Sequence, residues 1–194
     1  MNDNNGNKSL PVQVAIVGLH HYLQYGKRPN PRTDEIVELL SNSVNDDNER
    51  VQEFEMMTTR RAGAFVSYHN GDELRGCIGT IASTTPSVLD EILHNTVAAG
   101  TEDPRFLPIE LDELPKLTCS VDVLGDAEPI DGMDELDVKR YGVIVSNGWQ
   151  RGLLLPDLDG VDTPEQQVDI ALAKAGIEPG SDYDMQRFEV VRYS

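Results

Sequence analysis

Twice in the chain, the dipeptide Asn-Gly stands between two β-rich runs. Asn70-Gly71 separates residues 63–69 from residues 74–81, and Asn147-Gly148 separates residues 141–146 from residues 149–155. A two-residue type I′ turn needs φ > 0 at both central positions, which Asn and Gly tolerate better than other residues. Both segments are therefore predicted to fold as β-hairpins.

After each hairpin the same signals recur in the same order. Each returning strand contains Arg-Gly, each following helix starts at Thr-Pro and ends at Ala-Gly, and a further strand closes the unit. The paired signals stand at Arg75-Gly76 and Arg151-Gly152, and at Thr85-Pro86 and Thr163-Pro164. This order predicts two β-β-α-β units, over residues 62–124 and 141–193, that arose by internal duplication. The alternative is a coincidence of common turn and capping signals.

Helical signals dominate the chain before the first hairpin. Ser9 and Pro11 suit the start of a helix and Gly26 its end, and further helices are expected after Thr33 and from about Asn48. Residues 9–60 are thus a predicted helical part, and the Asn-rich residues 1–8 a disordered tail. The whole predicts a single α+β domain over residues 9–194, with a mainly antiparallel sheet and flanking helices.

The chain is strongly acidic. Its 194 residues carry 34 Asp and Glu against 16 Lys and Arg, a formal net charge of −18. Such a chain has no broad basic surface for phosphate backbones or anionic lipids, so direct nucleic-acid or membrane-surface binding is disfavoured. The N-terminus does not read as a signal peptide, and no apolar run approaches the length of a membrane span. With only two cysteines, the chain is expected in the cytoplasm.

The run Leu74–Thr80, with the sequence LRGCIGT, is the most unusual segment. Gly76 and Gly79 bracket Cys77 within one predicted strand, and glycine in a strand often marks a bulge or a close approach of another group. A guanidinium such as Arg75 favours a thiolate. Two interpretations stay open: Cys77 is a nucleophile or substrate-contacting thiol, or it is a small buried thiol that fills the core.

Two further segments offer chemistry. Asp103 and Arg105, in EDPRF, either present their charges to a cleft or form a local ion pair that staples a loop. His94 lies off the apolar face of its helix, and is either a general base near Cys77 or a packed or solvated histidine. Cys119 alternates with apolar residues and is predicted core, and Trp149 is predicted to pack as well.

Motifs for metals and nucleotides do not occur. The sequence has no CxxC, no HxxxH, no calcium-binding loop, no Walker lysine loop, no GxGxxG and no GxSxG. His20 and His21 are adjacent and point to different sides of a helix, so they do not suit a shared metal. The sequence predicts neither a metal site nor a bound cofactor.

Five runs together resemble the AMMECR domain family, and most of all its prokaryotic branch named AmmeMemoRadiSam system protein A. LRGCIGT, DPRF and LLLP are specific as a set, and the resemblance extends over about residues 10–193. The five runs are residues 63–81, 101–114, 120–131, 141–177 and 187–193.

The resemblance implies an α+β fold with an antiparallel sheet and flanking helices. It also implies that the protein functions together with two partners, a Memo-type protein similar to non-haem iron dioxygenases and a radical SAM protein. A role in RNA modification has been predicted for the family. Carried over to this chain, the family's usual candidate motif falls on Arg75, Gly76, Cys77 and Gly79. Asp103 and Arg105 are its companions.

Two functions are expected on these grounds, and whether the chain is an enzyme stays open. In the first, a pocket at Arg75 and Cys77 recognises or modifies a small anionic substrate or RNA. Arg75 and Arg105 then bind the anion, while Asp103 or His94 handles a proton. In the second, the chain is a non-catalytic interaction partner of the Memo-type and radical SAM proteins, and Cys77 is packing.

Overall fold

The computed structural model describes residues 8–43 and 48–194. Residues 1–7 of the predicted N-terminal tail lie outside this part. The chain divides into two compact units. The first extends to Val123 and takes in Arg192–Ser194, and the second comprises Leu124–Val191. Among the described residues, no helix combines the length and the apolar character that a membrane crossing needs.

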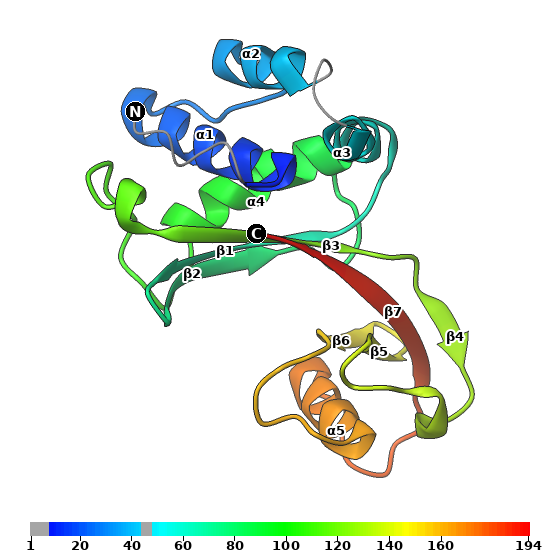
Figure 1. Ribbon diagram of the computed structural model, residues 1–194. Coiled ribbons are helices and arrows are strands. Elements are labelled where there is room, and N and C mark those ends of the chain that lie inside the picture. Colours follow the sequence, from blue (N-terminus) through cyan, green and yellow to red (C-terminus); the bar gives the residue numbers. More distant parts are fainter. Residues whose placement is uncertain (1–7, 44–47) are drawn as a thin grey trace. The chain divides into compact units, whose positions relative to one another are not determined.

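The first unit is a three-stranded antiparallel sheet with helices on one face (Figure 1). The helix α1 follows Ser9 and ends at Gly26, whose φ of +66° is left-handed, as the sequence predicts. Its elements are α1 (Leu10–Tyr25), α2 (Asp34–Ser43), α3 (Asn48–Thr59), β1 (Ala64–Asn70), β2 (Glu73–Gly79), α4 (Val88–Thr101), the short helix η1 (Leu114–Lys116) and β3 (Thr118–Leu124).

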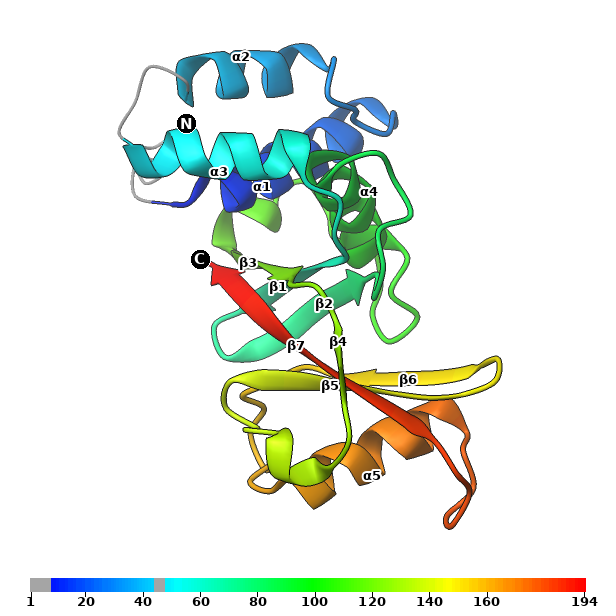
Figure 2. The same ribbon diagram turned by 90° about the vertical axis from the view of Figure 1, so that its right-hand side faces the viewer.

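Alternation along the strands places one side of this sheet against the helices. Val66 and Tyr68 of β1 pair with Val121 and Cys119 of β3, and all four are buried. The helices α1, α3 and α4 lie over this face, and α2 lies beyond α1 and α3 (Figures 1 and 2). Cys119 is core, as predicted, and burial raises the pKa of its thiol to about 12.

The second unit repeats this plan with one helix (Figure 2). The helix α5 covers one face of the hairpin β5–β6, and Val143, Val145, Leu154, Val168 and Ala171 form the core between them. Its elements are β4 (Glu128–Ile130), the short helix η2 (Met133–Glu135), β5 (Tyr141–Asn147), β6 (Gln150–Leu154), α5 (Pro164–Ala175) and β7 (Asp184–Tyr193), which pairs with β4 and β5.

Both units have the same strand order. The first runs β2-β1-β3 and the second β6-β5-β7, with antiparallel pairing throughout. Both hairpins form, but Asn70 pairs with Glu73 and Asn147 with Gln150, so the two-residue turns are Gly71-Asp72 and Gly148-Trp149. Gly71 and Gly148 have φ of +60° and +58°, whereas neither asparagine has a positive φ, so the predicted type I′ turns centred on Asn-Gly are wrong. The α+β class with an antiparallel sheet and flanking helices is confirmed. The equal strand orders agree with a duplication, which stays a prediction about ancestry.

Two further local predictions are wrong. The helix α4 begins after Ser87, whose hydroxyl accepts from the backbone N–H of Asp90, and not at Thr85. Thr85 instead donates its hydroxyl to the buried carboxylate of Glu91 at 2.6 Å. Trp149 does not pack, because it is the second residue of the two-residue turn of the β5–β6 hairpin, and 92% of its surface is exposed. In α5, by contrast, the predicted start at Thr163-Pro164 is correct, and Thr163 and Gln166 form a capping box there.

Candidate functional site

Cys77 lies in the middle of β2, opposite Ser67 of β1. The hydroxyl of Ser67 donates to its sulfur at 3.2 Å, and the cysteine is half-buried. The backbone N–H of Cys77 donates to Oδ2 of Asp103 at 2.9 Å, and its carbonyl accepts from Nη2 of Arg105 at 3.2 Å. Side chains of the DPRF segment therefore occupy the backbone groups that an added strand would otherwise pair.

Asp103 is almost completely buried, with 4% of its surface exposed. Its carboxylate accepts from Nε and Nη2 of Arg105 at 2.9 and 2.7 Å and from the backbone N–H groups of Cys77 and Arg105. The hydrogen bonds from Arg105 hold the pKa of Asp103 far below its usual range, although burial opposes them. A carboxylate with so low a pKa is a weak base, which counts against Asp103 in proton transfer at neutral pH.

Arg75 stands at a bulge in β2. Leu74 pairs with His69 and Gly76 with Tyr68, so Arg75 is the extra residue in its strand. Its guanidinium donates to both carboxylate oxygens of Glu113, at 2.8 and 3.0 Å, and to the carbonyls of Leu107 and Pro108. Only 18% of the Arg75 side chain is exposed, and all three guanidinium nitrogens donate to the protein itself.

These contacts fasten one segment, residues 102–113, which we call the edge loop. Asp103 and Arg105 attach its beginning to Cys77, and Glu113 attaches its end to Arg75. The pairing with Arg75 also lowers the pKa of Glu113, against a smaller effect of burial. Arg105 adds a cation–π contact, with its guanidinium carbon 5.4 Å from the centre of the Phe106 ring. Four of the predicted site residues thus meet in one cluster.

The two glycines of the motif permit close packing. A Cβ atom on Gly76 would lie 2.1 Å from the carbonyl oxygen of Ala99, so β2 lies directly on the backbone of α4. A Cβ on Gly79 would lie 2.2 Å from the ring of Phe65. In this structure the space at both glycines is filled by the protein itself.

The structure does not bring His94 to this cluster. His94 is exposed on α4, about 7.5 Å along the helix axis from Ala99. It borders a separate cavity of about 190 Å³ with Arg28, Asp90 and Leu93. In residues 8–43 and 48–194 no group of three or more His, Cys, Asp or Glu side chains is arranged to hold a metal ion.

Reasoning from the sequence missed Ser67, Glu113 and Glu91. Glu91 is fully buried and accepts from Thr80, Thr84 and Thr85, which orders the turn between β2 and α4. Burial raises the pKa of Glu91, but these hydrogen bonds outweigh it and leave the pKa lowered. The cluster of threonines before the helix was a usable signal for Glu91, whereas Glu113 carries no local signal.

Comparison with known proteins identifies the family. A profile of the AMMECR1 family matches residues 12–194. The chain belongs to the AMMECR1 family. A protein of Thermotoga maritima is 47% identical over 184 residues, which cover 94% of this chain and 95% of that protein. An uncharacterized protein of Pyrococcus horikoshii has a similar crystal structure, with a TM-score of 0.75 and 25% identity over 95% of this chain and 89% of that one.

Another AMMECR1-type relative is much longer. A protein of Clostridium acetobutylicum is 47% identical over 139 residues, which are 72% of this chain but 30% of that protein. The region that resembles this chain is therefore one part of a larger polypeptide there.

Proposed function

We propose that this AMMECR1-family protein is a non-catalytic binding component of the AmmeMemoRadiSam system, and that its edge loop contacts a Memo-type or radical SAM partner. The proposal rests on the observation that the polar groups of the motif bind other residues of this chain. Arg75, Asp103 and Arg105, and the backbone of Cys77, hold the edge loop on β2. We expect this component in the cytoplasm, with Cys77 and Cys119 as free thiols.

Binding a small anion or RNA at Arg75 and Cys77 is the weaker interpretation. An incoming anion would have to displace Glu113 from Arg75, or Asp103 from Arg105. Asp103 is 4% exposed, so separating it from Arg105 would leave a buried charge without its cation. Because Arg105 is itself 55% exposed, solvent moderates this cost, which is about 1 to 3 kcal/mol.

The edge loop also has two exposed apolar side chains. Leu107 is 83% exposed and Leu111 42% exposed, while Ile109 between them is buried and anchors the loop. Exposed apolar side chains on a fastened loop suit contact with another protein.

Co-purification tests the proposal. The full chain is expressed with tagged Memo-type and radical SAM proteins, and its retention is measured for the wild type and for Leu107→Asp. Loss of retention in Leu107→Asp is expected, with unchanged thermal unfolding. The control is Val37→Asp, since Val37 is 45% exposed on α2, outside the edge loop. Equal retention of Leu107→Asp and the wild type would show that the edge loop is not the contact.

One observation favours catalysis as a second candidate. The half-buried thiol of Cys77 receives a hydrogen bond from Ser67, and Arg105 lies against its carbonyl. In the co-expression strain, metabolites and RNA are surveyed by mass spectrometry for the wild type and Cys77→Ser. An unchanged product profile is expected for a binding component. A product lost in Cys77→Ser, with the complex intact, would replace binding by catalysis.

A further inference from the structure

A tryptophan lies in solvent at the turn of the β5–β6 hairpin. Trp149 is 92% exposed, the highest value among the large apolar side chains that the structure describes. Its indole has no ring contact and no side-chain hydrogen bond with another of the described residues. The turn does not require an indole, because the first hairpin has Asp72 at the same position after its turn glycine. Trp149 thus serves neither the turn nor the core of its unit.

The turn that carries Trp149 is held in place on both sides. Asn147, before the turn, donates from Nδ2 to the carbonyl of Asp182 at 2.9 Å, and Gln150, after the turn, donates from Nε2 to the carbonyl of Gly176. The two residues that flank the first turn make no side-chain hydrogen bond in the part of the chain that the structure describes. Because a group that is already held in place loses less entropy on binding, these contacts favour binding through the indole.

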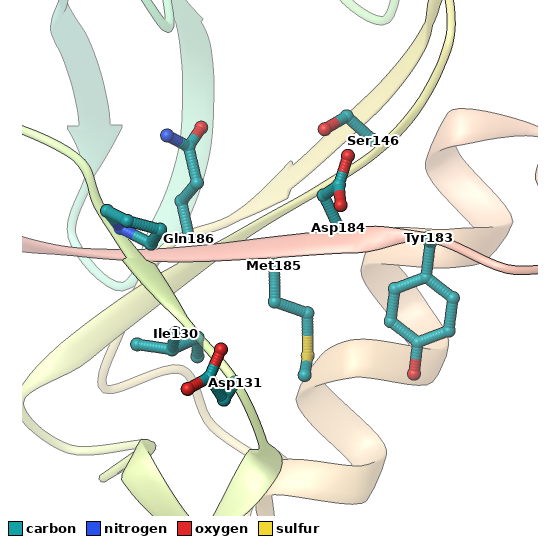
Figure 3. Close-up of a pocket in the computed structure, with 8 residues that line it drawn as sticks. Ile130, Asp131, Ser146, Tyr183, Asp184, Met185 and Gln186 are labelled. Atoms are coloured by element: carbon teal, nitrogen blue, oxygen red, sulfur yellow. The ribbon is translucent and has the colours of Figure 1, made fainter.

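The segment that holds the turn is acidic. Residues 176–184 carry three carboxylates and no Lys, Arg or His, and within the described residues none of the three forms an ion pair. Figure 3 shows one of them, that of Asp184, beside Ser146, with which Asp184 pairs across β5 and β7. Arg151, opposite Ser146 in β6, is one positive charge against these three. The three acids are Glu178, Asp182 and Asp184.

The charge around the indole selects the kind of partner. Tryptophan is among the residues that dominate the binding energy of protein interfaces, where its ring fills an apolar pocket. Open carboxylates beside the ring repel nucleic acids and anionic lipids, and a second copy of this chain has the same net charge of −18. Electrostatic complementarity therefore requires another protein, with Lys or Arg around the pocket that receives the ring.

We infer that residues 147–150, which we call the hairpin tip, are a second docking site, separate in sequence from the edge loop. In this site the indole of Trp149 enters an apolar pocket, rimmed by Lys or Arg, on a partner protein of the AmmeMemoRadiSam system. The choice of that partner rests on the proposed function. The contact itself rests on the exposure of the indole, the fastened turn and the acidic surroundings.

A fluorine label tests the contact in the full chain. Protein produced with 5-fluorotryptophan gives a single fluorine resonance, because Trp149 is the only tryptophan. The Memo-type protein, the radical SAM protein and phosphatidylcholine vesicles are added in separate titrations. A saturable shift or broadening is expected with one of the two proteins, and no change with the vesicles. The inference is overturned if neither protein changes the resonance, or if the vesicles do.

Variants then locate the contact. Trp149→Asp is expected to weaken binding of that protein by about thirtyfold, as for an interface residue of large effect, and Val37→Asp on α2 to leave it unchanged. Glu178→Gln and Asp182→Asn are each expected to weaken binding by about twofold, and Asp72→Asn, at the first hairpin, to leave it unchanged. Thermal unfolding checks that the variants fold alike. Unchanged binding of Trp149→Asp, or an equal loss in Asp72→Asn, overturns the inference.

The same assay separates this inference from the proposed function. Leu107→Asp changes the edge loop, and Trp149→Asp changes the hairpin tip. Weaker binding in both variants supports two contacts. A loss in Leu107→Asp alone supports the edge-loop contact and overturns the hairpin-tip contact, whereas a loss in Trp149→Asp alone does the reverse. Full binding of both variants overturns both contacts.

Discussion

The strands β2 and β6 hold the same place in their units, and their outer edges are covered differently. Each has a glycine packed on a helix backbone: a Cβ on Gly76 or on Gly152 would lie 2.1 Å from the carbonyl oxygen of Ala99 or Ala171. The next residue is Cys77 in β2 and Leu153 in β6. Asp103 and Arg105, which follow α4, cover the backbone of Cys77, whereas Lys174 of α5 itself reaches the carbonyl of Leu153 at 3.4 Å.

The pairing register of the two hairpins explains part of the difference between the outer edges. The pairing of β5 with β6 is regular, while β2 carries the bulge at Arg75. The scaffold is otherwise closely matched: Asn95 of α4 donates to the carbonyl of Ala64 at 2.9 Å, and Gln167 of α5 donates to that of Tyr141 at 2.8 Å. Both units therefore share one scaffold, and the first unit also has the edge loop fastened to its outer strand.

The shared scaffold predicts the largest effect. Gly76→Ala and Gly152→Ala each force a Cβ against a helix carbonyl, and we expect each to lower the free energy of unfolding by about 3 kcal/mol. Urea unfolding followed by circular dichroism measures both. If only one variant is destabilised, the two glycines do not have the same role, and the correspondence between the units fails.

The added loop predicts the next effect. Asp103→Asn removes a buried carboxylate from Arg105 and from the N–H of Cys77, and we expect a loss of about 2 kcal/mol at pH 7. The counterpart Lys174→Ala removes one long contact at an exposed residue, and little change is expected. If both variants lose a comparable free energy of unfolding, side-chain contacts stabilise the outer edges of β2 and β6 equally.

Low pH should remove the stabilisation that the ionised Asp103 gives to the folded protein. Its pKa in the folded protein is lowered by Arg105, so the unfolded state binds the proton more readily. The stabilisation is therefore complete above the unfolded pKa of about 3.9 and is lost as the pH falls from there toward the lower folded pKa. Urea unfolding between pH 7 and pH 3 should show the wild type and Asp103→Asn converging below about pH 4. A constant gap would assign the loss to packing instead of charge.

Arg75 and Arg151 occupy corresponding motifs with different surroundings. Arg75 makes four hydrogen bonds to the edge loop, so we expect Arg75→Ala to cost about 1 to 2 kcal/mol and to expose the loop to proteases. Arg151 is exposed and makes a single contact at 3.4 Å, so Arg151→Ala should leave both properties unchanged. Limited proteolysis with mass spectrometry locates the cut. Cleavage in the edge loop of both variants, or of neither, would contradict this assignment.

Local signals explain which features the sequence predicted. The two hairpins, the end of α1 at Gly26 and the start of α5 at Thr163-Pro164 each depend on residues a few positions apart. The start of α4 was misplaced because the buried Glu91 engages Thr85. The ion pair of Asp103 and Arg105, two positions apart, is one of the two alternatives that the sequence offered. Its attachment to Cys77, 26 positions earlier, and the pairing of Arg75 with Glu113, 38 positions later, have no local signal.

The smallest effect is expected where the two hairpins differ most visibly. After the turn glycine the first hairpin has Asp72 and the second Trp149, which is 92% exposed. If the hairpins share only their backbone, Trp149→Asp should change the free energy of unfolding by less than about 0.5 kcal/mol. Chemical denaturation followed by circular dichroism suits this test, because the variant lacks the only tryptophan of the chain. A larger loss would show that Trp149 packs in solution, and the second hairpin would then need its side chain as well as its turn.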